Sequence, residues 1–237
     1  MRPRFTRFAF VLVAVVSLAN CRSVENRPLD KARAGSIKTV AMLGISESKA
    51  VGLRDFSGFS GLGGAVGGAI SGATDADRSK AFVAEYNRRK VRLASSMADA
   101  LQQDLAKSGL EVLYLQNERP KLKDGADDYS HISTPANAIL NVWFGPIGYV
   151  YPRFSTTYEP WMMVNARLVN GKTKEVLYRK TFSAGYETII ANTVFVPCSK
   201  TVRFSSYDAL MGNYEQAIEA LSDCQKAVAQ QIVTDLK

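Results

Sequence analysis

Residues 96–115, SMADALQQDLAKSGLEVLYL, carry the clearest structural signal in the chain. Apolar side chains recur there at the spacing of one helix face, and Gly109 stands where that helix would end. Residues 110–115 are mostly apolar, which is typical of a buried strand. A helix joined to a strand by one glycine predicts a domain in which helices cover a sheet. The stripe consists of Ala94, Met97, Ala98, Leu101 and Leu105.

We expect this helix to begin further upstream and to cover residues 77–108, with Asp75 or Asp77 capping its first turn. Its first half carries a cluster of basic side chains. Such a run usually forms a solvent-exposed face, and contact with anionic lipid or a partner is the alternative. The cluster consists of Arg88, Arg89, Lys90 and Arg92.

Further segments have the pattern of strands. Residues 37–45 (IKTVAMLGI) and 138–144 (AILNVWF) are short and apolar. Residues 161–170 and 175–185 flank Asn170-Gly171, a pair that tolerates positive φ and predicts a hairpin. The first hairpin strand alternates as a half-buried strand should, with Met162, Val164, Ala166 and Leu168 as its apolar positions. The polar residues 116–135 are expected to form a loop.

The segment from Asn213 to Lys237 predicts a second amphipathic helix. The expected order is therefore strand, helix, strand, strand, hairpin, helix. We expect an α/β (α+β) fold, a two-layer arrangement in which a mixed sheet is packed by two long amphipathic helices. The crossover through the first helix favours parallel pairing, and the hairpin adds an antiparallel pair. The apolar face of the last helix consists of Tyr214, Ile218, Leu221, Val228, Ile232 and Leu236.

The N-terminus has the composition of a lipoprotein signal peptide, residues 1–20. Arg2, Arg4 and Arg7 precede an uncharged run, 8–18, that is too short to cross ~30 Å of hydrocarbon as a helix. The run ends in Leu18-Ala19-Asn20-Cys21, which has the pattern of a lipobox. We therefore expect cleavage before Cys21 and modification of this cysteine by palmitate or a similar acyl chain. Asn20 departs from the pattern, and secretory cleavage after Ala19 is the alternative.

The rest of the chain divides into two parts. We expect residues 21–36, which are polar, to be a flexible tether, and residues 37–237 to be a single domain. Removal of the three signal-peptide arginines lowers the formal charge from +8 to +5. That charge suits a protein near anionic lipid or cell wall, and the periplasmic compartment excludes nucleic acid as a partner.

The three cysteines of the chain fit an exported protein. If Cys21 carries lipid, Cys198 and Cys224 remain as a pair that the oxidising periplasm allows to form a disulfide. Two buried free thiols are the alternative. No CxxC motif occurs and His131 is the only histidine, so we expect no metal site.

Residues 56–74, FSGFSGLGGAVGGAISGAT, form an uncharged insertion with seven glycines. The glycines favour a loop, because each helical glycine costs ~1 kcal/mol relative to alanine. The alternative is a helix that contacts the membrane or another copy of the chain. Its glycine stripe would be Gly64, Gly68 and Gly72, and its apolar face would include Phe59 and Leu62.

Residues 143–161 combine seven aromatic residues with three prolines. Loops of this composition often present binding surfaces, because Tyr and Trp bury a large area at little cost in rotamer entropy. Packing against the sheet is the alternative. The residues expected to bind a partner are Tyr149, Tyr151, Phe154 and Tyr158.

No catalytic constellation is evident. Ser46-Glu47-Ser48-Lys49 matches SxxK, but it does not open a helix and the companion motifs of penicillin-recognising enzymes are absent. Gly171-Lys172-Thr173 matches only the end of a phosphate-binding loop and lies in a hairpin. We expect a protein that is not an enzyme and that needs no cofactor.

The segments KTVAMLGI, SMADALQQDLAKSGLEVLYL, ANAILNVWFGPI and MMVNARLVNGKTKEVLYRKTF stand in a defined order between the lipobox and the last helix. This order resembles the envelope lipoproteins built on the fold of the TolB amino-terminal domain, the group of CsgG and LpoB. The resemblance covers residues 37–237 and implies a scaffold, assembly factor or pore subunit. The insertion at 56–74 and the aromatic stretch depart from it.

The sequence predicts a lipid-anchored periplasmic adaptor, or an assembly or accessory factor of an envelope machine, that acts by contact with an envelope protein. Position 22 is Arg, where Asp would retain such a lipoprotein at the inner membrane, so we expect the outer membrane, with the domain facing the periplasm. One alternative is a subunit of an oligomeric outer-membrane export assembly, hence a homo-oligomer. The other is a carrier of an apolar ligand.

Overall fold

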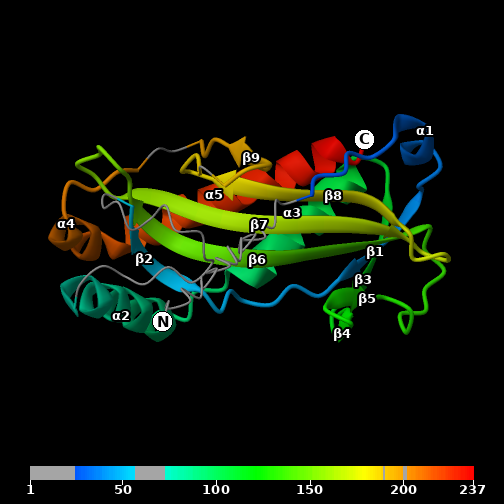
Figure 1. Cartoon of the computed structure of the whole chain (residues 1–237). Helices are drawn as coiled ribbons and strands as arrows, with labels where there is room; N and C mark the ends of the chain where they lie inside the picture. Colours follow the sequence, from blue (N-terminus) through cyan, green and yellow to red (C-terminus); the bar gives the residue numbers. More distant parts are fainter. Residues whose placement is uncertain (1–24, 57–72, 189, 200–201) are drawn as a thin grey trace, which may run out of the picture.

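The computed structural model describes residues 25–56, 73–188, 190–199 and 202–237 (Figure 1). The predicted signal peptide 1–20 and the predicted acylation site Cys21 lie outside the described residues. The membrane or self-contact residues predicted in the insertion also lie outside them; these are Phe59, Leu62, Gly64, Gly68 and Gly72.

The described strands form one mixed sheet of seven strands and a separate two-stranded hairpin. β6 lies at the centre of the large sheet. β7 runs antiparallel to β6, and β8 runs antiparallel to β7. β1 runs parallel to both β6 and β3, and β9 runs parallel to β8. The strands are β1 Thr39–Leu43, β2 Val51–Asp55, β3 Glu111–Leu115, β6 Ala138–Tyr151, β7 Glu159–Asn170, β8 Val176–Ala184 and β9 Thr193–Val196.

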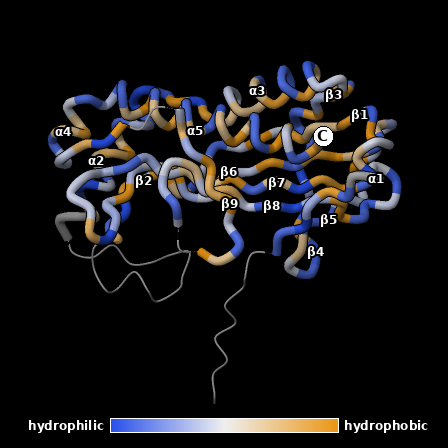
Figure 2. The backbone as a smooth tube through the Cα atoms, turned by 90° about the horizontal axis from the view of Figure 1, so that it is seen from above, coloured by the Kyte–Doolittle hydropathy of each residue, from blue (hydrophilic) through white to orange (hydrophobic). Residues whose placement is uncertain are grey.

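Two long helices cover one face of the sheet, as Figures 1 and 2 show. They are α3 Leu93–Lys107 and α5 Tyr214–Asp235, and the short α4 Tyr207–Gly212 precedes α5. The predicted stripe of α3 is buried throughout, and so is the alternating set of β7 that faces the helices. The α/β fold with two amphipathic helices on a mixed sheet is therefore confirmed. No helix in the described part of the chain is long and apolar enough to cross a membrane.

Gly109 ends α3 as the sequence predicts. It adopts φ +84°, a conformation that favours glycine. Its N–H donates to the carbonyl of Ala106, and the N–H of Leu110 donates to the carbonyl of Leu105, at 3.0 and 3.2 Å. These two bonds make a Schellman motif, which turns the chain directly from α3 into β3.

The prediction of one helix over 77–108 is wrong, because the segment forms two helices, α2 Ala73–Arg88 and α3. The chain turns at Lys90, which has φ +51°. In a continuous helix Arg88 and Arg92 would be neighbours at i and i+4, where like charges are destabilising. The break thus falls within the basic cluster and separates these two charges.

The basic cluster is partly neutralised within the molecule. Arg88 and Arg89 both donate to the carboxylate of Glu85, at 2.6–2.7 Å. Arg89 also donates to Glu215 at 2.8 Å, and this bond connects α2 to α5. These ion pairs are largely exposed, so each contributes little on its own.

β6 continues well beyond the expected strand 138–144. A bulge between Phe144 and Ile147 shifts its register with β7 at Pro146, which cannot donate to the ladder. Before the bulge β6 pairs with β1, and after it β6 pairs with β2. The sequence analysis did not predict β2 or β9.

The hairpin between β7 and β8 is confirmed, but its turn differs from the expected one. Asn170 and Gly171 do not adopt positive φ, whereas Lys174 does, with φ +61°. The Asn170 side chain accepts bonds from the N–H groups of Lys172 and Thr173, which makes an Asx turn. Gly171 is needed for close approach instead, because a Cβ there would lie 2.0 Å from the carbonyl oxygen of Ala136.

The opposite face of the sheet is covered in part by residues 116–135, which were expected to form a plain loop. This segment contains the small hairpin of β4 Lys121–Lys123 and β5 Ala126–Asp128. Tyr129 and Ile132 follow it and pack against Ile139 and Val169 of the sheet. No sequence pattern predicts these three-residue strands, because their pairing depends on the loop that joins them.

Residues 25–36, the described part of the expected tether, lie along the edge of β8, and we call them the strap. Arg27 forms an antiparallel bridge with Arg179 through two bonds of 2.7 and 2.8 Å. Leu29 packs on the main core, and a short helix follows, α1 Lys31–Ala34. Arg27 and Arg33 both donate to Glu175. The strap is therefore attached to the domain, in contrast to the flexible tether that its polar composition predicts.

Cys198 and Cys224 form a disulfide, as the sequence predicts. Cys224 is buried in α5, and Cys198 lies in the segment that follows β9. The bond therefore attaches this segment to the helix layer.

Removal of the disulfide by the double substitution Cys198→Ala and Cys224→Ala is expected to lower the free energy of unfolding by about 3–4 kcal/mol. The reason is the chain entropy released in the unfolded state by opening a loop of this length. Urea titration with and without reductant measures the effect. Reductant should bring the wild type to the level of the variant and leave the variant unchanged; a wild type insensitive to reductant would contradict the prediction.

Substitution Glu85→Gln is expected to destabilise the protein in a pH-dependent way. Hydrogen bonds from Arg88 and Arg89 lower the pKa of Glu85 from 4.5 to about 2. A carboxyl whose pKa falls on folding stabilises above its unfolded pKa, and the effect is lost as pH falls through the folded pKa. Urea midpoints of wild type and variant should differ fully above pH 4.5 and converge towards pH 2. Glu219→Gln on α5 controls for the lost charge, and a pH-independent difference for Glu85→Gln would refute the assignment.

Candidate functional sites

The structure separates the four aromatic residues that were expected to bind a partner. Tyr149 faces the helix layer and is fully buried, so its assignment to an exposed surface is wrong. Its ring packs edge-on against Phe82 and Phe204, and its hydroxyl donates to the carbonyl of Ala217. The composition of the stretch cannot show which of its strand residues face the helices, since alternate side chains of a strand point to opposite faces.

Tyr151 is the last residue of β6, and Phe154 and Tyr158 lie in the β6–β7 connection, residues 152–158. Tyr151 and Tyr158 are half-buried and pack edge to face, with ring centroids 5.3 Å apart. Tyr158 also pairs through its backbone with Phe204. Phe154 stands at the tip with 92% of its surface exposed and with φ +64°, which is unusual for a bulky side chain. The connection is thus braced at its base and presents one apolar side chain to solvent.

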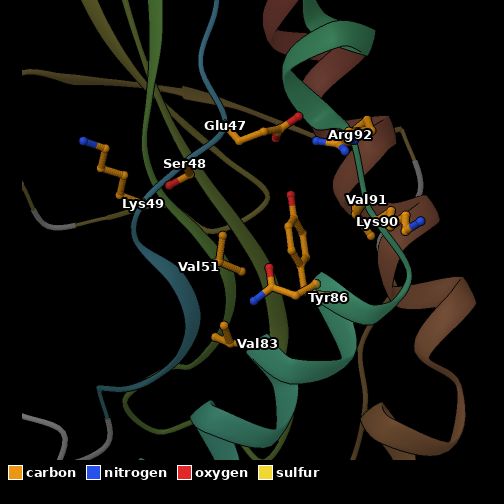
Figure 3. A pocket seen from close by; sticks show the side chains of 10 residues that line it. Glu47, Ser48, Lys49, Val51, Val83, Tyr86, Lys90, Val91 and Arg92 are labelled. Carbon is orange, nitrogen blue, oxygen red and sulfur yellow. The ribbon is translucent and has the colours of Figure 1, made fainter.

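A pocket of about 360 Å³ lies between the β1–β2 linker and the break between α2 and α3. Figure 3 shows the linker residues Glu47, Ser48 and Lys49 on one side, and Tyr86 of α2 and Arg92 of the break on the other. The remaining lining residues are Val51, Val83, Asn87, Lys90 and Val91.

Two interruptions of regular structure create this pocket. The β6 bulge separates β1 from β2, and the linker crosses the gap with the Ser48 hydroxyl donating to the carbonyl of Gly145 at 2.7 Å. On the helix side, Lys90 turns the chain between α2 and α3. The linker meets this break where Glu47 accepts a bond from the N–H of Ala94, in the first turn of α3. Glu47 therefore caps a helix whose own cap residue, Arg92, provides no side-chain bond.

Two polar atoms in the pocket are buried without a partner. Among the described residues, neither the hydroxyl of Tyr86 nor Oε2 of Glu47 has a hydrogen-bond partner. Only 5% of the Tyr86 surface is exposed. Burial, together with the nearby Glu47 carboxylate, raises the pKa of the Tyr86 hydroxyl, and Arg92 acts in the opposite direction. An unsatisfied buried polar group costs about 1–3 kcal/mol, so these atoms call for an explanation.

A second pocket of about 280 Å³ lies on the opposite face of the sheet, where Asn141 and Trp143 of β6 meet Asp127 and Arg119. Arg167 crosses beside it, donating to Asp127 at 2.6 Å and stacking on the Trp143 ring. This cluster already satisfies most of its own charges. Trp143, one of the aromatic residues of the stretch 143–161, thus packs against Arg167 on the face of the sheet opposite the helices.

The motifs considered for catalysis are not assembled into an active site. Ser46 lines the second pocket and Lys49 the first, so the SxxK residues are directed to different places. Lys172 and Thr173 lie in the β7–β8 turn. Within the described ranges, no three His, Cys, Asp or Glu side chains are placed to hold a metal ion. The sequence analysis missed Tyr86 and the polar role of Glu47, because nothing local in the sequence connects residues 39 positions apart.

No protein-family model and no curated protein matches the sequence. Among solved structures, a Xanthomonas campestris protein of family DUF330 has a TM-score of 0.42 and 11% identity over 83% of this chain and 81% of that one. PelC from Paraburkholderia phytofirmans, a dodecamer, gives 0.38 and 11% over 90% and 98%. Lipoprotein GNA1162 from Neisseria meningitidis gives 0.27 and 11% over 83% and 98%. The similarity is distant and concerns the arrangement of helices and strands alone.

Proposed function

We propose that this protein is a lipid-anchored periplasmic adaptor of the outer membrane, which acts by contact with an envelope protein and not as an enzyme. The observation that carries the proposal is the exposed side chain of Phe154 on its braced connection. A displayed aromatic side chain whose surroundings are already ordered loses little entropy when a partner covers it. The lipobox at Cys21 supports the anchoring, and Arg22 supports the outer membrane as its location.

The strap limits how far the domain can lie from the lipid. Glu25 is four residues from Cys21, which is a covalent reach of about 14 Å at full extension. An acyl chain on Cys21 therefore keeps the edge formed by β8 and β9 close to the membrane surface. Asn26 donates to the carbonyl of Asn192, next to the exposed side chains of Ile190 and Phe195. In the proposal these two apolar side chains face the lipid.

Substitution Cys21→Ser is expected to release the protein from the membrane fraction without altering its fold, because the acyl chain is the proposed anchor. Fractionation of envelopes and labelling with a palmitate analogue measure anchoring and acylation separately. Ser23→Ala, two positions away, is the matched control and should remain labelled and membrane-bound. Labelling that persists in the Cys21→Ser protein would contradict the assignment of the anchor.

Substitution Phe154→Ser is expected to abolish capture of the partner by photo-crosslinking in envelopes while the melting temperature stays unchanged. The side chain contributes little to the core, since it is 92% exposed. Leu122→Ser is the control, because Leu122 is 78% exposed and lies in β4, at the opposite end of the sheet (Figure 1). Equal capture by both variants and the wild type would reject the connection as a docking surface.

The same experiment separates the adaptor from the two alternatives. Crosslinks from residue 154 to a second copy of the chain would favour a subunit of an oligomeric export assembly. A captured apolar molecule would favour a carrier. Both alternatives stay predictions of the sequence.

A further inference from the structure

We propose that the pocket between the β1–β2 linker and the α2–α3 break binds a small zwitterion, an α-amino acid or dipeptide with an apolar side chain. Its ammonium group would bond to Glu47 Oε2 and the Tyr86 hydroxyl, and its carboxylate would face Arg92. This site is separate from the docking connection at Phe154 and does not depend on the proposed function.

The polar side chains of the pocket are arranged for a ligand that carries one positive and one negative group. In Figure 3 the Tyr86 hydroxyl points towards the space between the Glu47 carboxylate and the Arg92 guanidinium. Both side chains line the pocket, and no salt bridge of 4.0 Å or less joins Glu47 to Arg92 within the described structure. Glu47 keeps one oxygen on the N–H of Ala94 and leaves the other free to accept. A ligand ammonium supplies the donors that this oxygen lacks.

The apolar half limits the size and character of the ligand. Val51, Val83 and Val91 line the wall beside Tyr86. A volume of about 360 Å³ is at the small end of ligand pockets and fits an amino acid or a dipeptide. Lys49 and Lys90 extend away from the centre in Figure 3, so Arg92 is the cation that a bound carboxylate would meet.

The unpartnered hydroxyl distinguishes a binding site from a structural contact. Tyr214 offers a comparison in the same region, since its hydroxyl donates to the carbonyl of Phe82 at 3.1 Å and joins α5 to α2. The Tyr86 hydroxyl makes no such bond within the described part of the chain. Loss of a bonded hydroxyl should destabilise the fold, whereas loss of an unbonded one should leave stability unchanged or improved.

The test is calorimetric titration of the full-length protein, kept in detergent micelles, with L-valine at millimolar concentrations. N-acetyl-L-valine lacks the ammonium group and L-valinamide lacks the carboxylate. We expect L-valine to bind, and each blocked analogue to bind at least about tenfold more weakly, because each loses a charge-assisted hydrogen bond.

Three variants complete the test. Tyr86→Phe and Glu47→Gln should each weaken L-valine binding by about tenfold or more with unchanged melting temperature, since Gln keeps an oxygen for the N–H of Ala94. Tyr214→Phe should lower the melting temperature and leave the affinity unchanged. The proposal is overturned if L-valine gives no binding heat, if the blocked analogues bind equally well, or if Tyr86→Phe binds like the wild type.

Discussion

The division of one edge of β6 between two parallel partners is the constraint on which the rest of the structure depends. A single continuous neighbour along this edge would have to follow β6 through its bulge at Gly145 and Pro146. Instead β1 pairs with the first part of β6 and β2 with the last, and the linker between them leaves the sheet. The N–H of Ile147 donates to the carbonyl of Ala50, which returns the chain to the ladder at the start of β2.

The helix layer accommodates the same interruption. α3 packs on β3, the neighbour of β1, and α2 packs beside β2, so the helices also separate where the strands do. Glu47 connects the two interruptions by capping α3 from the linker. The pocket therefore results from the bulge, and its unpartnered polar atoms lie where regular backbone bonding ends on both sides.

Contacts of the N-terminal strap and of the segment after β9 also stabilise the domain. The strap bonds to β8 through Arg27, the β7–β8 turn holds it through Glu175, and the disulfide joins the segment after β9 to α5. The strap at Arg179 and β9 at residues 181–184 together cover the β8 edge, where an open strand would invite association with other chains. In the proposed function, the strap would place an acylated Cys21 near this edge, so that anchoring would orient the domain as well as retain it.

Much of the fold could be predicted from the sequence, because its main elements carry their own signals. The stripe of α3, the positive φ at Gly109 and the hairpin strands are local patterns, and each appears in the structure. β9 and the break at Lys90 could not be predicted, since the first depends on an existing edge of β8 and the second separates two helices that pack on different strands, β2 and β3.

The candidate sites were less predictable than the fold. The aromatic composition of residues 143–161 correctly indicated Phe154 as an exposed residue, but it could not tell this residue from the buried Tyr149. Which face a residue of β6 occupies depends on the bulge, and the bulge is a property of the paired sheet. The pocket needs Glu47 and Tyr86 together, and only the tertiary structure brings them into one place.

The most direct test of the account is the depth of the β8–β9 edge in lipid. A nitroxide attached to Phe195→Cys in the acylated protein, reconstituted in phospholipid vesicles, reports its accessibility to oxygen and to a water-soluble nickel complex. The same label at Leu122→Cys serves as the reference. We predict that the label at 195 is exposed to oxygen and shielded from nickel, while the label at 122 is accessible to nickel. Equal nickel accessibility at both positions would show that the domain is not held against the membrane by its strap, and would contradict the account.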